Sequence, residues 1–108
     1  MIRSIVVLVA IVAALPAQAQ RVSQINGNRL MALCRTAELT GCDAYLAGIA
    51  DAIAEAPEPH LACIPPVVTA AQLRAVVLKL LHDEPDKREK PAAEIVVHAY
   101  GKAFACHP

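Results

Sequence analysis

The sequence predicts an all-α fold, a small, disulfide-stapled four-helix domain of two αα-hairpins. Apolar residues recur three and four positions apart over four separate segments, as they do on one face of an α-helix. The connectors between these segments are short, which favours antiparallel neighbours. Four cysteines in a chain of 108 residues give an even count that suits a disulfide framework. This length suits a single domain.

Residues 1–19 read as a secretory signal peptide. A positively charged start precedes an unbroken apolar run, and an A-x-A cleavage pattern closes the segment. A membrane anchor is the alternative, but the run stops at Pro16 and is too short to span about 30 Å of hydrocarbon. We expect cleavage between Ala19 and Gln20, which leaves residues 20–108 as a periplasmic domain with no membrane segment.

The first two helices are expected over residues 28–37 and 41–56. The turn sequence Asn26-Gly27-Asn28 suits the start of the first helix, and Thr40 suits the N-cap of the second. Gly48 lies inside the second helix, where we expect it to allow the close approach of a neighbouring helix. The apolar faces consist of Leu30, Leu33, Cys34 and Ala37 in the first helix, and Cys42, Tyr45, Leu46, Ile49, Ile53 and Ala56 in the second.

The third and fourth helices are expected over residues 70–82 and 91–105. Residues 69–72 read T-A-A-Q, the pattern of a capping box before the third helix. Pro91 suits the first position of the fourth helix. The apolar faces consist of Leu73, Val76, Val77, Leu80 and Leu81 in the third helix, and Ala92, Ile95, Val96, Ala99 and Ala103 in the fourth, with Tyr100 and Phe104 at its edge.

The hairpin topology suggests how the four cysteines pair. Cys34 lies near the end of the first helix and Cys42 at the start of the second, while Cys63 precedes the third helix and Cys106 follows the fourth. We therefore expect the disulfides Cys34–Cys42 and Cys63–Cys106. A Cys42–Cys63 bond stays open as the alternative, although its connection would have to run back along the whole second helix. Export favours disulfides over metal ligation, and no C-x-x-C motif is present.

The sequence predicts neither an enzyme nor a cofactor. It contains no G-x-S-x-G, no H-E-x-x-H and no glycine-rich phosphate loop. A cysteine nucleophile beside His98 or His107 is the catalytic alternative, but an even set of exported cysteines favours oxidation. Asp51 and Glu55 are expected on a solvated face of the second helix. The formal net charge of +0 argues against a nucleic-acid partner.

A series of motifs runs from Cys34 to Cys106, within a match that extends from about Gly27 to Cys106. In order they are C-x7-C-D-A-Y-L-A-G-I-A-D-A, C-I-P, V-T-A-A-Q-L-R-A-V-V-L-K-L-L, A-x-x-I-V-x-x-A and F-A-C. Together these motifs resemble the Rap/Tai immunity proteins, which counter peptidoglycan amidase effectors delivered by type VI secretion systems. The sequence departs from that pattern at Pro66-Val67, where the resemblance leads us to expect a glycine before the V-T pair.

The resemblance implies a periplasmic inhibitor that occupies the active-site cleft of a cell-wall amidase without chemistry of its own. It also implies a homodimer. We take the charged connector, residues 83–90, together with the exposed face of the third helix, as the candidate contact surface. A solvated loop without a partner is the alternative for this connector. The predicted contact residues are Asp83, Glu84, Asp86, Lys87 and Arg88.

A second class of function stays open, that of a small helical periplasmic chaperone or acid-stress protein. This interpretation predicts that acid dissociates the protein into monomers and exposes apolar surface.

Overall fold

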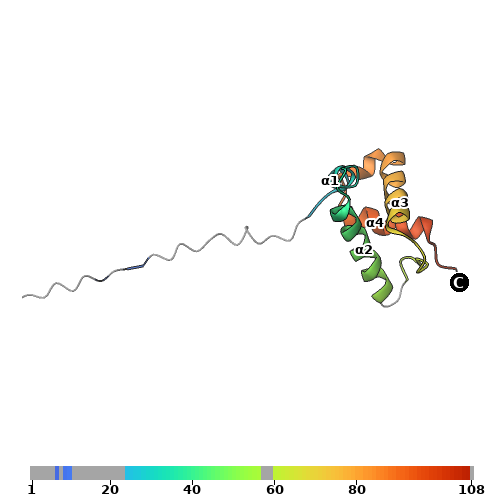
Figure 1. Ribbon diagram of the computed structural model, residues 1–108, viewed down its shortest axis with the longest axis horizontal. Helices are drawn as coiled ribbons and strands as arrows, with labels where there is room; N and C mark the ends of the chain where they lie inside the picture. The colour runs from blue at the N-terminus through green and yellow to red at the C-terminus, as the bar shows by residue number, and fades with distance from the viewer. Residues whose placement is uncertain (1–6, 8, 11–23, 57–59, 108) are drawn as a thin grey trace, which may run out of the picture.

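The computed structural model describes residues 7, 9, 10, 24–56 and 60–107 (Figure 1). The expected cleavage site between Ala19 and Gln20 lies outside the described residues. Within them the elements are, in chain order, α1 (Gly27–Leu33), α2 (Thr40–Glu55), α3 (Ala70–Asp83), the 3-10 helix η2 (Pro85–Glu89) and α4 (Ala92–Ala103). The described ranges contain no strand beyond one isolated bridge, so the predicted all-α class is confirmed.

The helices form one compact unit in which α4 contacts every other element. α2 and α3 lie side by side, and α4 packs against both (Figure 1). α1 lies beside the start of α2 and contacts η2, which follows α3. The segment that carries the predicted contact residues is therefore fixed by helices from both ends of the chain.

α1 begins at Gly27, one residue before the predicted start, and ends earlier than expected. The Asn26 side chain accepts a hydrogen bond from the Arg29 amide at 3.0 Å, which makes Asn26 the N-cap. The prediction that the helix continues to Ala37 was wrong, since it ends at Leu33. The Thr36 hydroxyl lies 3.2 Å from the Leu33 carbonyl oxygen and 2.6 Å from that of Glu38. These side-chain hydrogen bonds support a turn in place of a further helical turn.

The start of α1 is joined to the start of α4 through the backbone. The Gly27 amide donates to the Lys90 carbonyl at 3.0 Å, and the Ala92 amide donates to the Ile25 carbonyl at 2.8 Å. Gly27 is buried here, and a Cβ atom on it would lie 2.9 Å from both the Cα atom and the carbonyl oxygen of Arg88, as well as 2.6 Å from Ile95 Cδ1. Only glycine allows this close approach.

The start of α2 differs from the prediction by one residue. Thr40 is the first helical residue and not the N-cap, which is Leu39, a residue whose side chain makes no capping hydrogen bond. The Thr40 amide donates to Glu38 Oε1 at 2.9 Å, and the Thr40 hydroxyl also donates to it. These hydrogen bonds, led by that from the hydroxyl, lower the pKa of Glu38 below its ordinary value. A carboxylate just before a helix is favourable toward its N-terminal dipole.

The expectation for Gly48 was also wrong. Gly48 is exposed, and a Cβ atom built on it would meet nothing within 4 Å among the described residues. No neighbouring helix uses the missing side chain, and the glycine at this position has no explanation in the fold.

α3 and α4 follow their predicted bounds closely. The capping box before α3 is confirmed: the Thr69 hydroxyl accepts from the Gln72 amide at 3.2 Å, and Gln72 Oε1 accepts from the Thr69 amide at 2.7 Å. α4 begins at Ala92 and ends at Ala103, two residues before the predicted end. The prediction that Pro91 is the first helical residue was wrong, since Pro91 is the N-cap. Both helices direct most of their predicted apolar residues into the core, but Ala103 is exposed.

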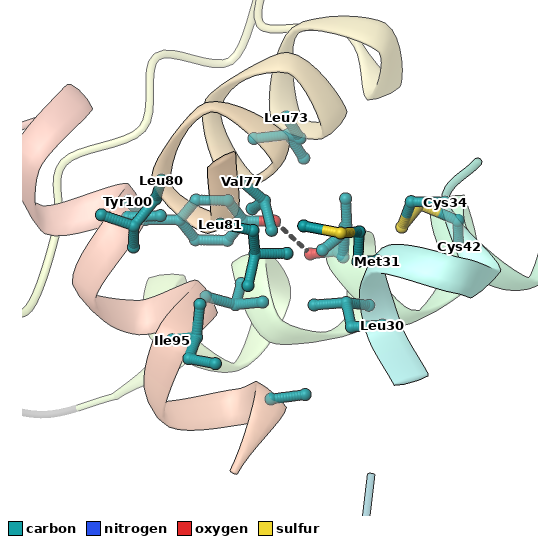
Figure 2. Packing of buried hydrophobic residues seen from close by; sticks show 14 of the residues in the cluster. Leu30, Met31, Cys34, Cys42, Leu73, Val77, Leu80, Leu81, Ile95 and Tyr100 are labelled. Carbon is teal, nitrogen blue, oxygen red and sulfur yellow. Dashed lines mark hydrogen bonds between the residues drawn. A yellow bond between two sulfur atoms is a disulfide. The ribbon is translucent and has the colours of Figure 1, made fainter. Parts of the chain in front are cut away.

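The core has Tyr100 at its centre, not at its edge as the sequence pattern indicated. Tyr100 is fully buried, and its hydroxyl donates to the Leu46 carbonyl at 2.8 Å, so it links α4 to α2 (Figure 2). Burial raises the pKa of this hydroxyl. The largest fully buried side chains are Tyr100, Leu30, Leu46, Leu81, Ile95, Val77, Val96 and Cys42.

Both predicted disulfides are present, and they use all four cysteines. Cys34–Cys42 joins the end of α1 to the start of α2, and Cys63–Cys106 joins the segment before α3 to the residues after α4. The Cα–Cα distance is 5.0 Å in each, within the range of disulfide geometry. The alternative Cys42–Cys63 pairing is excluded.

Candidate partner-binding surface

The charged connector, residues 83–90, contains the 3-10 helix η2 and is not an unstructured loop. Pro85 opens η2, and the backbone hydrogen bonds from Lys87 to Glu84 and from Lys90 to Lys87 close its turns. The Arg88 side chain is half-buried, and its Nε donates to the Leu81 carbonyl at 2.7 Å. This hydrogen bond satisfies a carbonyl in the last turn of α3, where a cation is also favourable toward the helix dipole.

Lys87 and Glu84 connect η2 to α4. Lys87 Nζ lies 3.1 Å from Glu84 Oε1 and 3.3 Å from Nε2 of the exposed His98. Glu84 Oε2 lies 3.8 Å from Lys102 Nζ, too far for a hydrogen bond, and this oxygen is buried without a hydrogen-bond partner. The hydrogen bond from Lys87 lowers the pKa of Glu84, and the charges of Lys87 and Lys102 act in the same direction.

Asp83 and Asp86 differ in their surroundings. Asp83 Oδ2 lies 2.5 Å from Lys79 Nζ, one helical turn earlier in α3, and this hydrogen bond lowers the pKa of the Asp83 carboxyl. Asp86 is exposed and makes no hydrogen bond or ion pair within the described residues. Of the predicted contact residues, Asp86 is therefore the one most freely presented to a partner.

A groove of about 320 Å³ lies between α3 and α4 beside these residues. Its lining combines apolar side chains of the two helices with a rim of both charge signs: Val76, Lys79, Leu80, Asp83, Glu84, Ala99, Lys102 and Ala103. A second hollow, of about 420 Å³, lies between η2 and α4 and is lined by Lys87, Lys90, Glu94, Ile95, Val97 and His98. Apolar surface bordered by charges is the usual composition of a protein-binding patch.

The structure brings only some of the predicted contact residues to these hollows. Asp83 and Glu84 line the groove and Lys87 lines the second hollow, whereas Asp86 and Arg88 line neither. Two lysines complete the charged rim of the groove. Lys79 lies on the exposed face of the third helix, which the prediction included without naming this residue, whereas Lys102 was missed. The spacing of Lys79 and Asp83, four residues apart on one helix, was a signal for the first. Lys102 reaches the rim only through the packing of α4 on α3, which no local pattern shows.

Other charged residues have structural contacts away from this surface. Arg74 of α3 pairs with Asp43 of α2, so the two helices share an ion pair. Across the described part of the chain, no cluster of three or more His, Cys, Asp or Glu residues could hold a metal ion. No helix within these residues is both long and apolar enough to cross a membrane.

The comparison with protein families gives this surface its context. The model of the Rap1a immunity proteins matches residues 26–106, which is most of the chain and includes both disulfides and every helix of the described residues. The chain belongs to the Rap1a immunity protein family. No curated protein and no solved structure gives a significant match.

Membership confirms the resemblance that the motifs indicated. In this Rap1a protein the matched range begins at the N-cap of α1 and ends at Cys106, the last disulfide cysteine. The groove between α3 and α4 and the whole of η2 lie inside it. The candidate surface is thus part of the family domain.

Proposed function

We propose that this Rap1a protein is a periplasmic immunity protein that binds a peptidoglycan amidase effector of a type VI secretion system and covers its active-site cleft. The observation that carries the proposal is the family match over residues 26–106. The two disulfides support an oxidising compartment such as the periplasm. The proposed mechanism is steric and requires no catalytic group.

The proposed contact surface consists of η2 and the neighbouring groove between α3 and α4. Its charged rim carries Lys79 and Asp83 from α3, Glu84 from the junction, and Lys102 from α4. Such a mixed rim favours a partner with complementary charges and sets the rate and register of association. The backbone bonds to α1, the Arg88 hydrogen bond and the Glu84–Lys87–His98 contacts hold η2 in place. A surface ordered before binding loses less entropy when the partner docks.

The test is inhibition of a purified amidase effector, taken from a gene next to the one that encodes this chain. We expect the oxidised protein to stop peptidoglycan hydrolysis at a one-to-one ratio. The double variant Asp86→Lys with Lys102→Ala should weaken inhibition by about tenfold or more, because it reverses an exposed charge on η2 and removes one charge from the rim of the groove. The matched control is Asp51→Lys, since Asp51 is exposed on α2.

The outcomes separate the parts of the proposal. Failure of the native protein to bind or inhibit the amidase would overturn the proposed activity. Equal inhibition by the double variant and the native protein would overturn the contact surface alone. Prevention of client aggregation at about pH 3, with dye binding to newly exposed apolar surface and no amidase binding, would favour the acid-stress chaperone. We also propose that the protein forms a homodimer, as the family resemblance implies. Sedimentation equilibrium should then give twice the mass of one chain.

A further inference from the structure

The two disulfides lie in different surroundings. Cys34 is 5% exposed and Cys42 is 0% exposed, and both belong to the hydrophobic core. Figure 2 shows their sulfur–sulfur bond at one end of the drawn core side chains. Cys63 is exposed and Cys106 is half-buried, and neither belongs to the core cluster. A reagent in solution can therefore approach Cys63 in the folded protein, whereas both cysteines of the other bond are buried.

We propose that Cys63–Cys106 is a thiol-exchange site, open to a small dithiol in the folded protein while Cys34–Cys42 stays closed. Thiol–disulfide exchange requires a thiolate to reach a disulfide sulfur, so access controls its rate. Exposed disulfides are also the ones that thiols reduce most readily. The inference rests on burial and does not depend on the proposed immunity function.

The exchange proceeds in two steps. A thiolate of the dithiol attacks the Cys63 sulfur, a mixed disulfide forms, and Cys106 leaves as a thiolate that takes up a proton. The second thiol of the reagent then loses its proton and attacks the reagent's first sulfur, which is bonded to Cys63. This closes the cyclic disulfide of the reagent and releases Cys63 as a thiolate. The protein disulfide gains two electrons, and the reagent is oxidised to a cyclic disulfide.

Reduction at this site would loosen one end of the molecule. After cleavage, the segment before α3 is held to the end of α4 by the hydrogen bond from the Cys63 amide to the Phe104 carbonyl at 2.8 Å and by the burial of Ala62. The Leu61 carbonyl also lies close to Gly101, 3.1 Å from where a Cβ atom would stand. Figure 1 shows this segment and the C-terminus on the side of the molecule away from α1 and η2. The α1–α2 junction and η2 should therefore stay in place.

The experiment exposes the full oxidised protein to increasing dithiothreitol, followed by an acid quench, alkylation and peptide mass spectrometry. We expect Cys63 and Cys106 to become alkylated at least about tenfold faster than Cys34 and Cys42. Hydrogen exchange should rise at residues 60–68 and 104–107 in the partly reduced protein and remain unchanged in η2. In guanidinium chloride the two bonds should be reduced at similar rates, because unfolding removes the difference in burial.

A variant that lacks the exposed bond measures the reduction of the buried bond by itself. The double variant Cys63→Ser with Cys106→Ser keeps only the buried bond, which should still be reduced more slowly than Cys63–Cys106 is reduced in the native protein. The proposal would be overturned by simultaneous loss of both bonds, by earlier reduction of Cys34–Cys42, or by equal protection of both bonds in the folded protein.

Discussion

At the scale of single residues, Tyr100 shows how one polar atom is accommodated in an apolar core. Its ring is fully buried between α4 and α2, and its hydroxyl finds the Leu46 carbonyl at 2.8 Å. The chain has only three aromatic residues, two Tyr and one Phe, and Phe104 lies 6.4 Å from Tyr100 between ring centroids. An alanine-rich chain thus relies on one large side chain to fill the space between its helices.

The variant Tyr100→Phe should lower the free energy of unfolding by about 1 kcal/mol, because it removes one buried hydrogen bond and keeps the ring. Tyr100→Ala should cost about 3–5 kcal/mol through the cavity it leaves. Urea denaturation followed by circular dichroism measures both. If Tyr100→Phe lowered the free energy of unfolding as much as Tyr100→Ala, the hydroxyl and not the ring would supply most of the stabilisation.

Two glycines offer a matched pair of alanine substitutions. Gly27→Ala should destabilise the protein by about 1–3 kcal/mol, because the new Cβ would lie 2.6 Å from Ile95 Cδ1 and 2.9 Å from Arg88 Cα. Gly48→Ala should stabilise it by about 0.5–1 kcal/mol, because the site is open and alanine favours the helix. Thermal melts of both variants beside the native protein decide the signs. A stabilising Gly27→Ala would show that η2 moves away from α1 easily.

At the scale of elements, the sequence predicted the helix ends that are set by neighbouring residues and missed the features that are set by contacts between distant segments. The Thr69–Gln72 capping box and the unbroken apolar stripe of α3 lie within one segment, so the helix could be placed within a residue. The end of α1 depends on Thr36 and on the disulfide to α2, and the central place of Tyr100 depends on a carbonyl of another helix. These contacts leave no trace in helical spacing.

The same division applies to the candidate surface. The run of charges at residues 83–90 was visible in the sequence, and it does carry Asp83 and Glu84 to the groove. That this run forms a 3-10 helix against α1 was not visible, because the close approach involves Gly27 far earlier in the chain. Lys102 was missed for the same reason, since it joins the rim only across the interface of α3 and α4.

The connection of η2 to α4 should weaken in acid. The pKa of Glu84 in the folded protein lies below its ordinary value of 4.5, so its ion pairs stabilise the fold above that pH and are lost as the pH falls through the lowered pKa. Asp83 shifts in the same direction, from an ordinary value of 3.8. Thermal melts between pH 7 and pH 3 should therefore show stability falling below about pH 4.5.

The variant Glu84→Gln tests which group is responsible. It should lower the melting temperature at pH 7 and make its decline below pH 4.5 shallower than in the native protein. The control Glu55→Gln changes an exposed carboxylate of α2 and should leave the pH profile as it is. An unaltered acid profile in Glu84→Gln would assign the effect to other carboxylates.

At the scale of the whole molecule, the two disulfides constrain the unfolded chain to different extents. Cys34–Cys42 joins residues 8 positions apart, whereas Cys63–Cys106 joins residues 43 positions apart and encloses α3, η2 and α4. Removing the longer link, as Cys63→Ser with Cys106→Ser, should lower the free energy of unfolding by up to about 4 kcal/mol. Guanidinium denaturation with and without the substitutions measures this loss. If the denaturation midpoint of the variant equals that of the native protein, the unfolded variant must retain compact structure even without this disulfide.

The backbone pairing of Ile25 and Gly27 with Lys90 and Ala92 also orders events in time. A chain made from its N-terminus releases the start of α1 long before its partners around Pro91 exist. Until those residues emerge, Gly27 has no carbonyl to donate to and the pocket that buries it is not yet built. α1 is therefore made first but can dock only after the residues around Pro91 have been made. A chain that ends before Pro91 would leave α1 without these backbone partners.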